Sequence, residues 1–258
     1  MTAFPSLATV TYSPRVSIAL LVTIAALSAA CQESDPGETE AERCAIPERP
    51  EPGSVAPDLP QGPSLAERDL SGCDLRGIDL SDSDLWRANL TMTDLRDADL
   101  TGAYAAETTL TGANLEDATL VELDLFNATG SGANMRDAIL TRAILAGATL
   151  PSTDLHGADL VDVFAEAVVL TESDLSDADM RRIHLVVADL AGASLEGADL
   201  TGANMHGADV RNASLLGAIM NDQVSNRLGV NNTICPNGSN SNDEVPPACY
   251  ILLDDGGL

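Results

Sequence analysis

An apolar residue recurs at every fifth position between residues 63 and 222, without one insertion or deletion. The series runs from Leu65 to Met220 and has 32 members, of which 24 are Leu and four are Met. The residue two positions before each member is usually small, with 19 Ala among the 32, and the residue immediately before it is Asp or Asn in 18. The repeating unit is therefore Ala-(Asp/Asn)-Leu-x-x.

This period of five fits neither regular secondary structure. An α-helix repeats every 3.6 residues and a β-strand every two, so either one would scatter the leucines over several faces. The pattern is satisfied if the chain turns a corner every five residues and each corner returns a Leu to a common interior. Four sides then make a coil of 20 residues, and the 160 residues of the repeat form about eight coils. At the ~4.8 Å spacing of β-strands the stack is about 38 Å long.

The pattern also predicts which residues are buried. The Leu and the small residue two positions before it face inward, whereas the other three positions of each unit face water. Gly130 stands where a Leu is expected and predicts a locally loose coil. Ala105 and Ala165 are undersized members of the series, and each follows an aromatic residue.

The repeat resembles that of the pentapeptide-repeat family, whose consensus is Ala-(Asp/Asn)-Leu-x-x. Residues 98–102 and 198–202 match this consensus cleanly, and the resemblance covers 160 of 258 residues, about 62% of the chain. It implies an all-β fold, a right-handed quadrilateral β-helix. It implies little about activity, because a fold does not determine a function.

The repeats occupy residues 63–222. The rest of the chain divides into three segments. Residues 1–30 resemble a signal peptide, because the uncharged run from Val16 to Ala30 is short for a membrane-spanning helix. Residues 31–62 are an acidic, Pro-rich tether that cannot bury enough apolar surface to fold alone. Residues 223–258 are predicted to form a Cys-closed cap on the end of the solenoid.

Cys31 follows three small residues, Ser28, Ala29 and Ala30, in a sequence similar to the lipobox of bacterial lipoproteins. We expect its thiol to carry a lipid that anchors the protein in the bacterial cell envelope. The outer membrane is favoured, because Gln32 is not the Asp that often retains lipoproteins in an inner membrane. The alternative is ordinary cleavage after Ala30, which would release a secreted protein.

Four cysteines remain if Cys31 is lipidated. The tail around Cys235 and Cys249 resembles the Cys-closed tail of some secreted pentapeptide-repeat proteins, which implies a disulfide between these two residues. Cys44 of the tether and Cys73 of the first coil are a second candidate pair, since export favours disulfides. The alternative for Cys73 is a small core residue with a free thiol.

Acidic residues outnumber basic ones by 40 to 13, which gives a net charge of −27. We expect no nucleic-acid partner, because phosphate binding needs positive charge. The family resemblance offers an alternative function, since cytoplasmic members imitate DNA and inhibit DNA gyrase, but the predicted export argues against it. The sequence shows no catalytic constellation and no cofactor motif. His184 and His206 fall on neighbouring coils of one side, where solvated histidines are expected rather than a metal site.

One side of the coil differs from the others in its outward residues. Its inward centres are residues 65, 85, 105 and so on to 205, and it carries all four aromatic residues of the repeats, so we call it the aromatic side. Of the other sides, one carries alternating charges and another a ladder of Ser and Thr. The candidate interaction residues of the aromatic side are Trp86, Tyr104, Phe126, Ile144, Phe164 and Val186.

An exposed apolar stripe marks an interaction site or a surface that another segment covers. A protein partner or a second copy could bind the stripe, or the tether or tail could lie across it. Alternatively, Tyr104 and Phe164 could compensate locally for Ala105 and Ala165. We expect a non-enzymatic envelope lipoprotein that presents a rigid acidic solenoid for protein–protein contact, without a cofactor.

Overall fold

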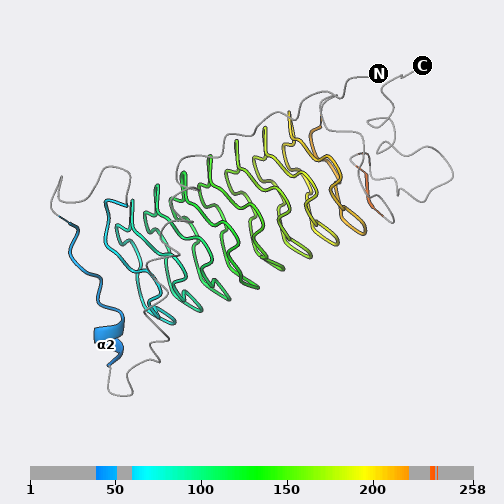
Figure 1. Ribbon diagram of the computed structural model, residues 1–258. Coiled ribbons are helices and arrows are strands. Elements are labelled where there is room, and N and C mark those ends of the chain that lie inside the picture. Colours follow the sequence, from blue (N-terminus) through cyan, green and yellow to red (C-terminus); the bar gives the residue numbers. More distant parts are fainter. Residues whose placement is uncertain (1–38, 51–59, 221–232, 236, 238–258) are drawn as a thin grey trace, which may run out of the picture. The chain divides into compact units, whose positions relative to one another are not determined.

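The computed structural model describes residues 39–50, 60–220, 233–235 and 237 (Figure 1). These residues all belong to one compact unit that begins at Thr39. Their only helix is α2, Glu40–Arg43, and the remainder is a coil held together by isolated parallel β-bridges. Among these same residues, no helix has the length and apolar character needed to cross a membrane. The predicted signal peptide and Cys31 lie outside them.

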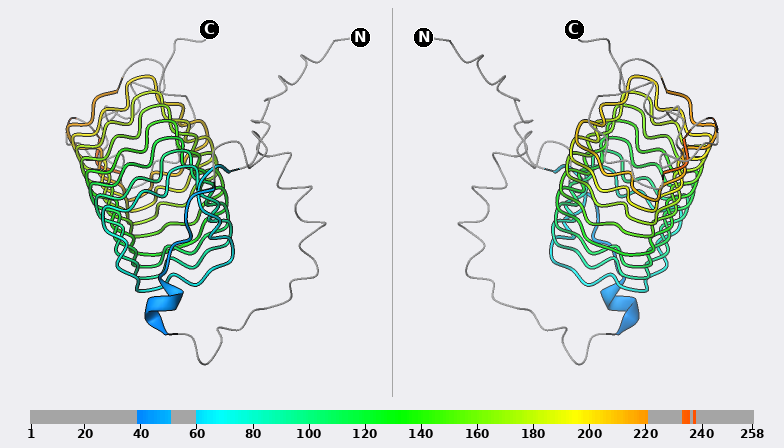
Figure 2. Two further views of the ribbon diagram at one scale, coloured as in Figure 1. Left: turned by 90° about the vertical axis from the view of Figure 1, so that its left-hand side faces the viewer. Right: turned by 90° about the vertical axis from the view of Figure 1, so that its right-hand side faces the viewer.

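The β-bridges give the coil its length of 20 residues. Each bridge joins a residue to the one 20 positions later, as Asp69 pairs with Asn89 and Asn89 with Thr109. Bridged residues occur at every fifth position from Ser64 to Ile219. Four ladders of parallel bridges therefore run along the stack, one on each side of the coil (Figures 1 and 2).

The core is the one that the repeat predicts. Every central residue from Leu65 to Leu215 is buried. The residue two positions earlier is also buried, with Arg68 and Ile78 of the first coil as the exceptions among the described repeats. Burying one Leu side chain contributes about 1.5–3 kcal/mol, so the stacked leucines are the main stabilising feature of the solenoid.

The frequent Asp or Asn before each Leu has a structural reason. Its side-chain oxygen accepts a hydrogen bond from the backbone N–H two residues further on, at 3.0 Å from Ser71 N to Asp69 Oδ1 and 2.9 Å from Thr101 N to Asp99 Oδ1. Short polar side chains of this kind imitate a backbone turn. This hydrogen bond closes the corner of the coil. It explains why the residue before the central Leu is so often Asp or Asn.

The last residue of each unit completes the corner with a left-handed backbone. φ is positive at all 31 of these positions from Glu67 to Gly217, which comprise 12 Gly and 19 other residues. Only Gly adopts this conformation without steric cost. Val187, with a φ of 52°, is a β-branched residue in the same region, where such residues are rare.

Gly130 does not loosen its coil, so this prediction was wrong. A Cβ built on Gly130 would lie 2.8 Å from the backbone carbonyl carbon of Leu110, one coil earlier. The two coils therefore approach each other closely at this point, and their backbones take up the space that a Leu would need.

The repeat also extends beyond Met220, where the sequence pattern stops. Ile234 pairs with Ser214 in the same 20-residue spacing, and the N–H of Leu215 donates to the Ile234 carbonyl at 2.8 Å. Thr233 and Cys235 are buried at the corresponding inward positions. One bridge of this ladder therefore lies beyond residue 222, in the segment predicted to cap the solenoid. This further unit is hard to recognise in the sequence because its central residue is Cys235 and not a Leu.

Candidate interaction surface

The aromatic side presents two parallel rows of outward residues. The first row is a bridge ladder that connects Tyr104, Asp124, Ile144, Phe164 and His184 at 20-residue steps. The second row consists of the corner residues that follow each central residue. The structure brings the six candidate residues onto this one side, with Tyr104, Ile144 and Phe164 in the ladder row and Trp86, Phe126 and Val186 in the corner row.

Exposure varies along these rows. Phe164 is 50% exposed and Phe126 38%, whereas Trp86, Tyr104, Ile144 and Val186 are half-buried. Three outward positions between them are buried, namely Ala106, Asp124 and Ala146. Val187, which the sequence list of candidates omitted, is 55% exposed beside Val186. The aromatic side therefore has exposed apolar side chains that lie next to buried or half-buried ones.

Two of the aromatic rings contact charged or titratable neighbours. The Phe164 ring stacks on the His184 imidazole, with ring centroids 4.8 Å apart and 24° between the planes. The Arg87 guanidinium lies 4.3 Å from the centre of the Trp86 ring, and its Nε donates to Glu107 Oε2 at 2.8 Å. These contacts hold the rings in defined positions on the surface.

The Asp84 carboxyl and the Tyr104 phenol lie in a poorly solvated environment. Burial raises the pKa of the Asp84 carboxyl, although its Oδ1 accepts a hydrogen bond from the Trp86 N–H. Burial, followed by the carboxylates of Asp124 and Asp84, raises the pKa of Tyr104 to about 12. Groups that water reaches freely do not shift in this way, so the surroundings of Asp84 and Tyr104 are partly shielded from water.

Three residues of this side lack the side-chain oxygen that caps the corner in most units. Tyr104, Ile144 and Phe164 occupy the ladder position where Asp or Asn accepts the corner N–H, and none of them has an oxygen placed to do so. Val187 adds a strained backbone. Features that reduce local stability are typical of functional surfaces.

The structure speaks against local compensation as the reason for the aromatic residues. Larger residues are buried at inward positions near the two undersized centres: Leu123 one coil beyond Ala105, Val163 in the unit of Ala165, and Ile183 one coil beyond it. The ring of Phe164 points outward, as its exposure shows. The described tether, residues 39–50, forms its hydrogen bonds and disulfide with residues of the first coil.

The three cysteines among the described residues fall at the two ends of the stack. Cys44 and Cys73 form a disulfide, with Cα atoms 5.6 Å apart, so of the two interpretations of Cys73 the structure has the bridge. Cys235 is also disulfide-bonded. Cys249 lies outside the described residues, and its pairing with Cys235 therefore stays a prediction.

One polar cluster was missed by the sequence reasoning. His156 Nδ1 lies 2.8 Å from Ser176 Oγ, and Ser176 Oγ donates to Asp174 Oδ1 at 2.5 Å. The carboxylate contacts the Ser hydroxyl and not the imidazole, whereas in a Ser-His-Asp triad the His lies between the other two residues, so this cluster does not have the order of a nucleophilic triad. Within the described ranges, no group of three or more His, Cys, Asp or Glu could hold a metal ion.

Comparison with known proteins agrees with this geometry. A family model described as pentapeptide repeats matches residues 65–185 and 188–222 in eight copies, which is more than half of the chain. The chain belongs to the pentapeptide-repeat family. Proteins of this family form right-handed quadrilateral β-helices, and the four bridge ladders are those of such a coil. No curated protein matches the sequence.

Several solved structures of the family are similar to this chain. The pentapeptide repeat protein HetL, involved in heterocyst differentiation regulation in the cyanobacterium Nostoc sp. strain PCC 7120, is 31% identical over 69% of this chain and 91% of its own, with a TM-score of 0.48. QnrB1, a plasmid-mediated fluoroquinolone resistance protein, is 16% identical over 62% of this chain and 79% of its own, with a TM-score of 0.38. A pentapeptide repeat protein of the Arabidopsis thaliana thylakoid lumen is 19% identical over 71% and 88%, with a TM-score of 0.18. The family assignment depends on the repeats and not on these superpositions.

Proposed function

We propose that this protein is a non-enzymatic binding protein, an acidic solenoid of about eight coils that holds a partner protein on its aromatic side. The observation that carries the proposal is the concentration of partly exposed aromatic residues on one side, two of which, Tyr104 and Phe164, stand where most units have the Asp or Asn that caps the corner. Aromatic residues dominate the binding energy of protein interfaces. A partner that buries this stripe would account for the gathering of these residues on one side.

The charge of the molecule narrows the class of partner. A net charge of −27 disfavours close approach of a second copy along the whole length of a side. A partner surface that combines apolar side chains with Lys and Arg would be attracted to it and would match the acids beside the rings. We therefore propose a heterologous protein with a basic surface rather than a homodimer on this side.

The proposed location is the bacterial cell envelope, with a lipid on Cys31. The Cys44–Cys73 disulfide supports an oxidising compartment, because disulfides persist outside the cytoplasm. Metabolic labelling with a fatty-acid analogue should mark the parent protein, and the variant Cys31→Ser should lose the label. Labelling that survives this substitution would contradict the anchor.

The aromatic side is tested by crosslinking in the cells that produce the protein. A photoreactive amino acid placed at Phe164 should crosslink to one defined protein. The same amino acid at Thr111, exposed on the hydroxyl-bearing side, is the matched control and should not. Equal crosslinking at both positions would show that this side has no special role.

The partner obtained in this way then allows a quantitative test with purified proteins. Trp86→Ser combined with Phe126→Ser should weaken binding by at least tenfold, equivalent to about 1.4 kcal/mol. Met92→Ser combined with Ile139→Ser removes exposed apolar residues from other sides and should leave affinity unchanged. Trp86 is the only Trp, so its emission should shift to shorter wavelength when the partner binds. Equal losses in both double variants would refute the proposal.

A further inference from the structure

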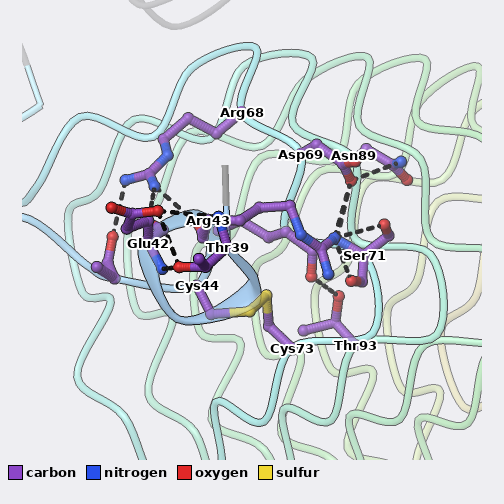
Figure 3. The surroundings of a disulfide bond; sticks show 12 residues. Thr39, Glu42, Arg43, Cys44, Arg68, Asp69, Ser71, Cys73, Asn89 and Thr93 are labelled. Carbon is purple, nitrogen blue, oxygen red and sulfur yellow. Dashed lines mark hydrogen bonds and ion pairs between the residues drawn. A yellow bond between two sulfur atoms is a disulfide. The ribbon is translucent and has the colours of Figure 1, made fainter. Parts of the chain in front are cut away.

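Residues 39–50 lie against the N-terminal edge of the first coil (Figure 3). Helix α2 begins with a capping box, in which Thr39 Oγ1 accepts from the Glu42 N–H and the Glu42 carboxylate accepts from the Thr39 N–H. Cys44 and Ile46 pack against the core of the solenoid, and Cys44 is joined to the inward residue Cys73. We call residues 39–50 the N-terminal cap.

Two arginines of the cap replace the coil that is missing before the first one. Inside the stack, a backbone carbonyl accepts a hydrogen bond from an N–H of the preceding coil. The Thr91 carbonyl accepts from the Gly72 N–H in this way, and the Thr101 carbonyl accepts from the Asp82 N–H. The equivalent carbonyls of the first coil belong to Ser71 and Ser81. Arg43 Nη1 donates to the Ser71 carbonyl at 2.5 Å and to the Ser71 hydroxyl at 2.9 Å. Arg49 Nη2 donates to the Ser81 carbonyl at 3.0 Å and to the Ser81 hydroxyl at 2.8 Å.

The first coil holds the cap in return. Arg68 donates to the backbone carbonyls of Ala45 and Arg43, both at 2.8 Å, and to that of Glu42 at 3.3 Å. Arg43 also pairs with Asp69 at 3.6 Å. The cap is therefore attached through one covalent bond, three arginine side chains and the packing of Cys44 and Ile46 against the core.

The surface under the cap is suited to a second copy of this chain. Each coil offers the next one the same parallel bridges at the same 20-residue spacing. An open coil edge presents unpaired N–H and C=O groups that can pair with another edge of matching spacing. Contact between coil edges is confined to one end, so the net charge opposes it less than it opposes contact along a whole side.

We propose that the N-terminal cap is a removable cover over this coil edge, and that the uncovered edge binds the solenoid edge of a second copy. The Cys44–Cys73 disulfide keeps the cover closed. A dithiol reductant opens it by supplying two electrons and two protons, which break the S–S bond and give two Cys thiols while the reductant becomes a disulfide. The remaining arginine contacts can then exchange with water.

The test compares molar mass by light scattering over a range of protein concentrations, with Cys31→Ser in every variant so that no lipid contributes. The uncapped variant carries Arg43→Ala, Arg49→Ala, Cys44→Ser and Cys73→Ala, and Ala is the residue that most units have at the position of Cys73. Its average mass should at least double as concentration rises, whereas the capped protein stays at the mass of one chain. Loss of two Arg makes the chain more acidic, so charge alone predicts the opposite result.

Three controls keep the outcome specific. Arg142→Ala with Arg181→Ala makes the same charge change several coils away from the cap and should remain at the mass of one chain. Trp86→Ser with Phe126→Ser in the uncapped variant should not prevent association, which separates this edge from the aromatic side. Circular dichroism should show that the coil signal is retained in each variant.

A milder variant covers the case in which the uncapped protein fails to fold. Cys44→Ser with Cys73→Ala keeps both arginines, and a photoreactive amino acid at the exposed first-coil residue Ser64 reports on the edge. Crosslinks between chains should appear in this variant and be absent from the disulfide-bonded protein. A folded uncapped variant that stays at the mass of one chain, or equal crosslinking with and without the disulfide, would overturn the proposal.

Discussion

At the scale of single residues, the five positions of each unit have separate physical tasks. The central Leu and the small inward residue fill the interior, the Asp or Asn caps the corner, and the last residue turns the chain with a positive φ. Residues that depart from these tasks are the informative ones. On the aromatic side, Tyr104, Ile144 and Phe164 abandon the capping bond, and Val187 keeps a left-handed backbone despite its branched side chain.

Val187→Gly should stabilise the solenoid. The left-handed conformation costs a residue other than Gly about 1–2 kcal/mol, and Gly loses about 0.5–1 kcal/mol more conformational entropy on folding, so the net gain is about 0.5–1 kcal/mol. Urea denaturation followed by circular dichroism measures it. Ala167→Gly, at the equivalent position one coil earlier with a φ of 55°, should gain less because Ala is not β-branched. A less stable Val187→Gly variant would show that the Val side chain contributes packing that its exposure does not reveal.

At the scale of the coil, stability comes from contact between neighbours. Each inward Leu stacks on the residues 20 positions before and after it, and the bridges join the same pairs of coils. In such an array a local defect weakens its own coil and the two adjacent ones rather than the whole molecule. Larger inward residues are buried near the undersized centres Ala105 and Ala165.

Leu140→Ala should lower the free energy of unfolding by about 2–5 kcal/mol, because Leu140 is fully buried and the substitution leaves a cavity. Thr141→Ala, at the next, outward position, is the matched control and should change it by less than about 0.5 kcal/mol. Thermal and chemical unfolding of both variants give the comparison. Similar values for the two variants would be incompatible with an interior filled by leucines.

At the scale of the whole molecule, charge and covalent closure shape its behaviour. Four Arg residues clamp the Asp two positions before them on the same coil, as Arg76 Nη2 does with Asp74 Oδ2 at 2.6 Å. The other three pairs are Arg96 with Asp94, Arg181 with Asp179, and Arg211 with Asp209. Disulfides involve inward residues at both ends, Cys73 in the first coil and Cys235 beyond the last uninterrupted repeat.

These clamps predict a loss of stability in acid. Hydrogen bonds from Arg76 lower the pKa of Asp74 from 3.8 to about 2, and hydrogen bonds from their own Arg partners also lower the pKa of Asp179 and Asp209. A carboxyl whose pKa is lower in the folded state stabilises the fold above pH 3.8, and this contribution disappears as the pH falls toward 2. The melting temperature should therefore decrease between about pH 4 and pH 2.

The control for this prediction removes the donors and keeps the acids. Arg76→Gln with Arg181→Gln should flatten the decrease, because two of the carboxyls then titrate nearer their ordinary range. Asp84 acts in the opposite sense, since burial raises its pKa and its ionised form is disfavoured in the folded state. A melting temperature that rises steadily from pH 4 to pH 2 would show that relief of charge repulsion outweighs the clamps.

The sequence alone determined the repeat, the division into inward and outward positions, and the gathering of Trp86, Tyr104, Phe126 and Phe164 on one side. It could do so because these features depend only on spacing. When every unit has five residues and every coil has 20, residues a multiple of 20 apart must share a side. The bridges show this spacing throughout residues 64–219.

Tertiary structure decided everything that does not follow this spacing. The Cys44–Cys73 disulfide and the Arg43 and Arg49 contacts join segments 28 to 32 residues apart, a separation that the repeat does not set. At Gly130 the backbone approaches that of Leu110 in the preceding coil. The sequence does not reveal how closely two backbones pack. Ile234 rejoins its ladder after residues whose sequence no longer shows the period. In each case the deciding energy is a contact between chain segments, and only the folded arrangement brings those segments together.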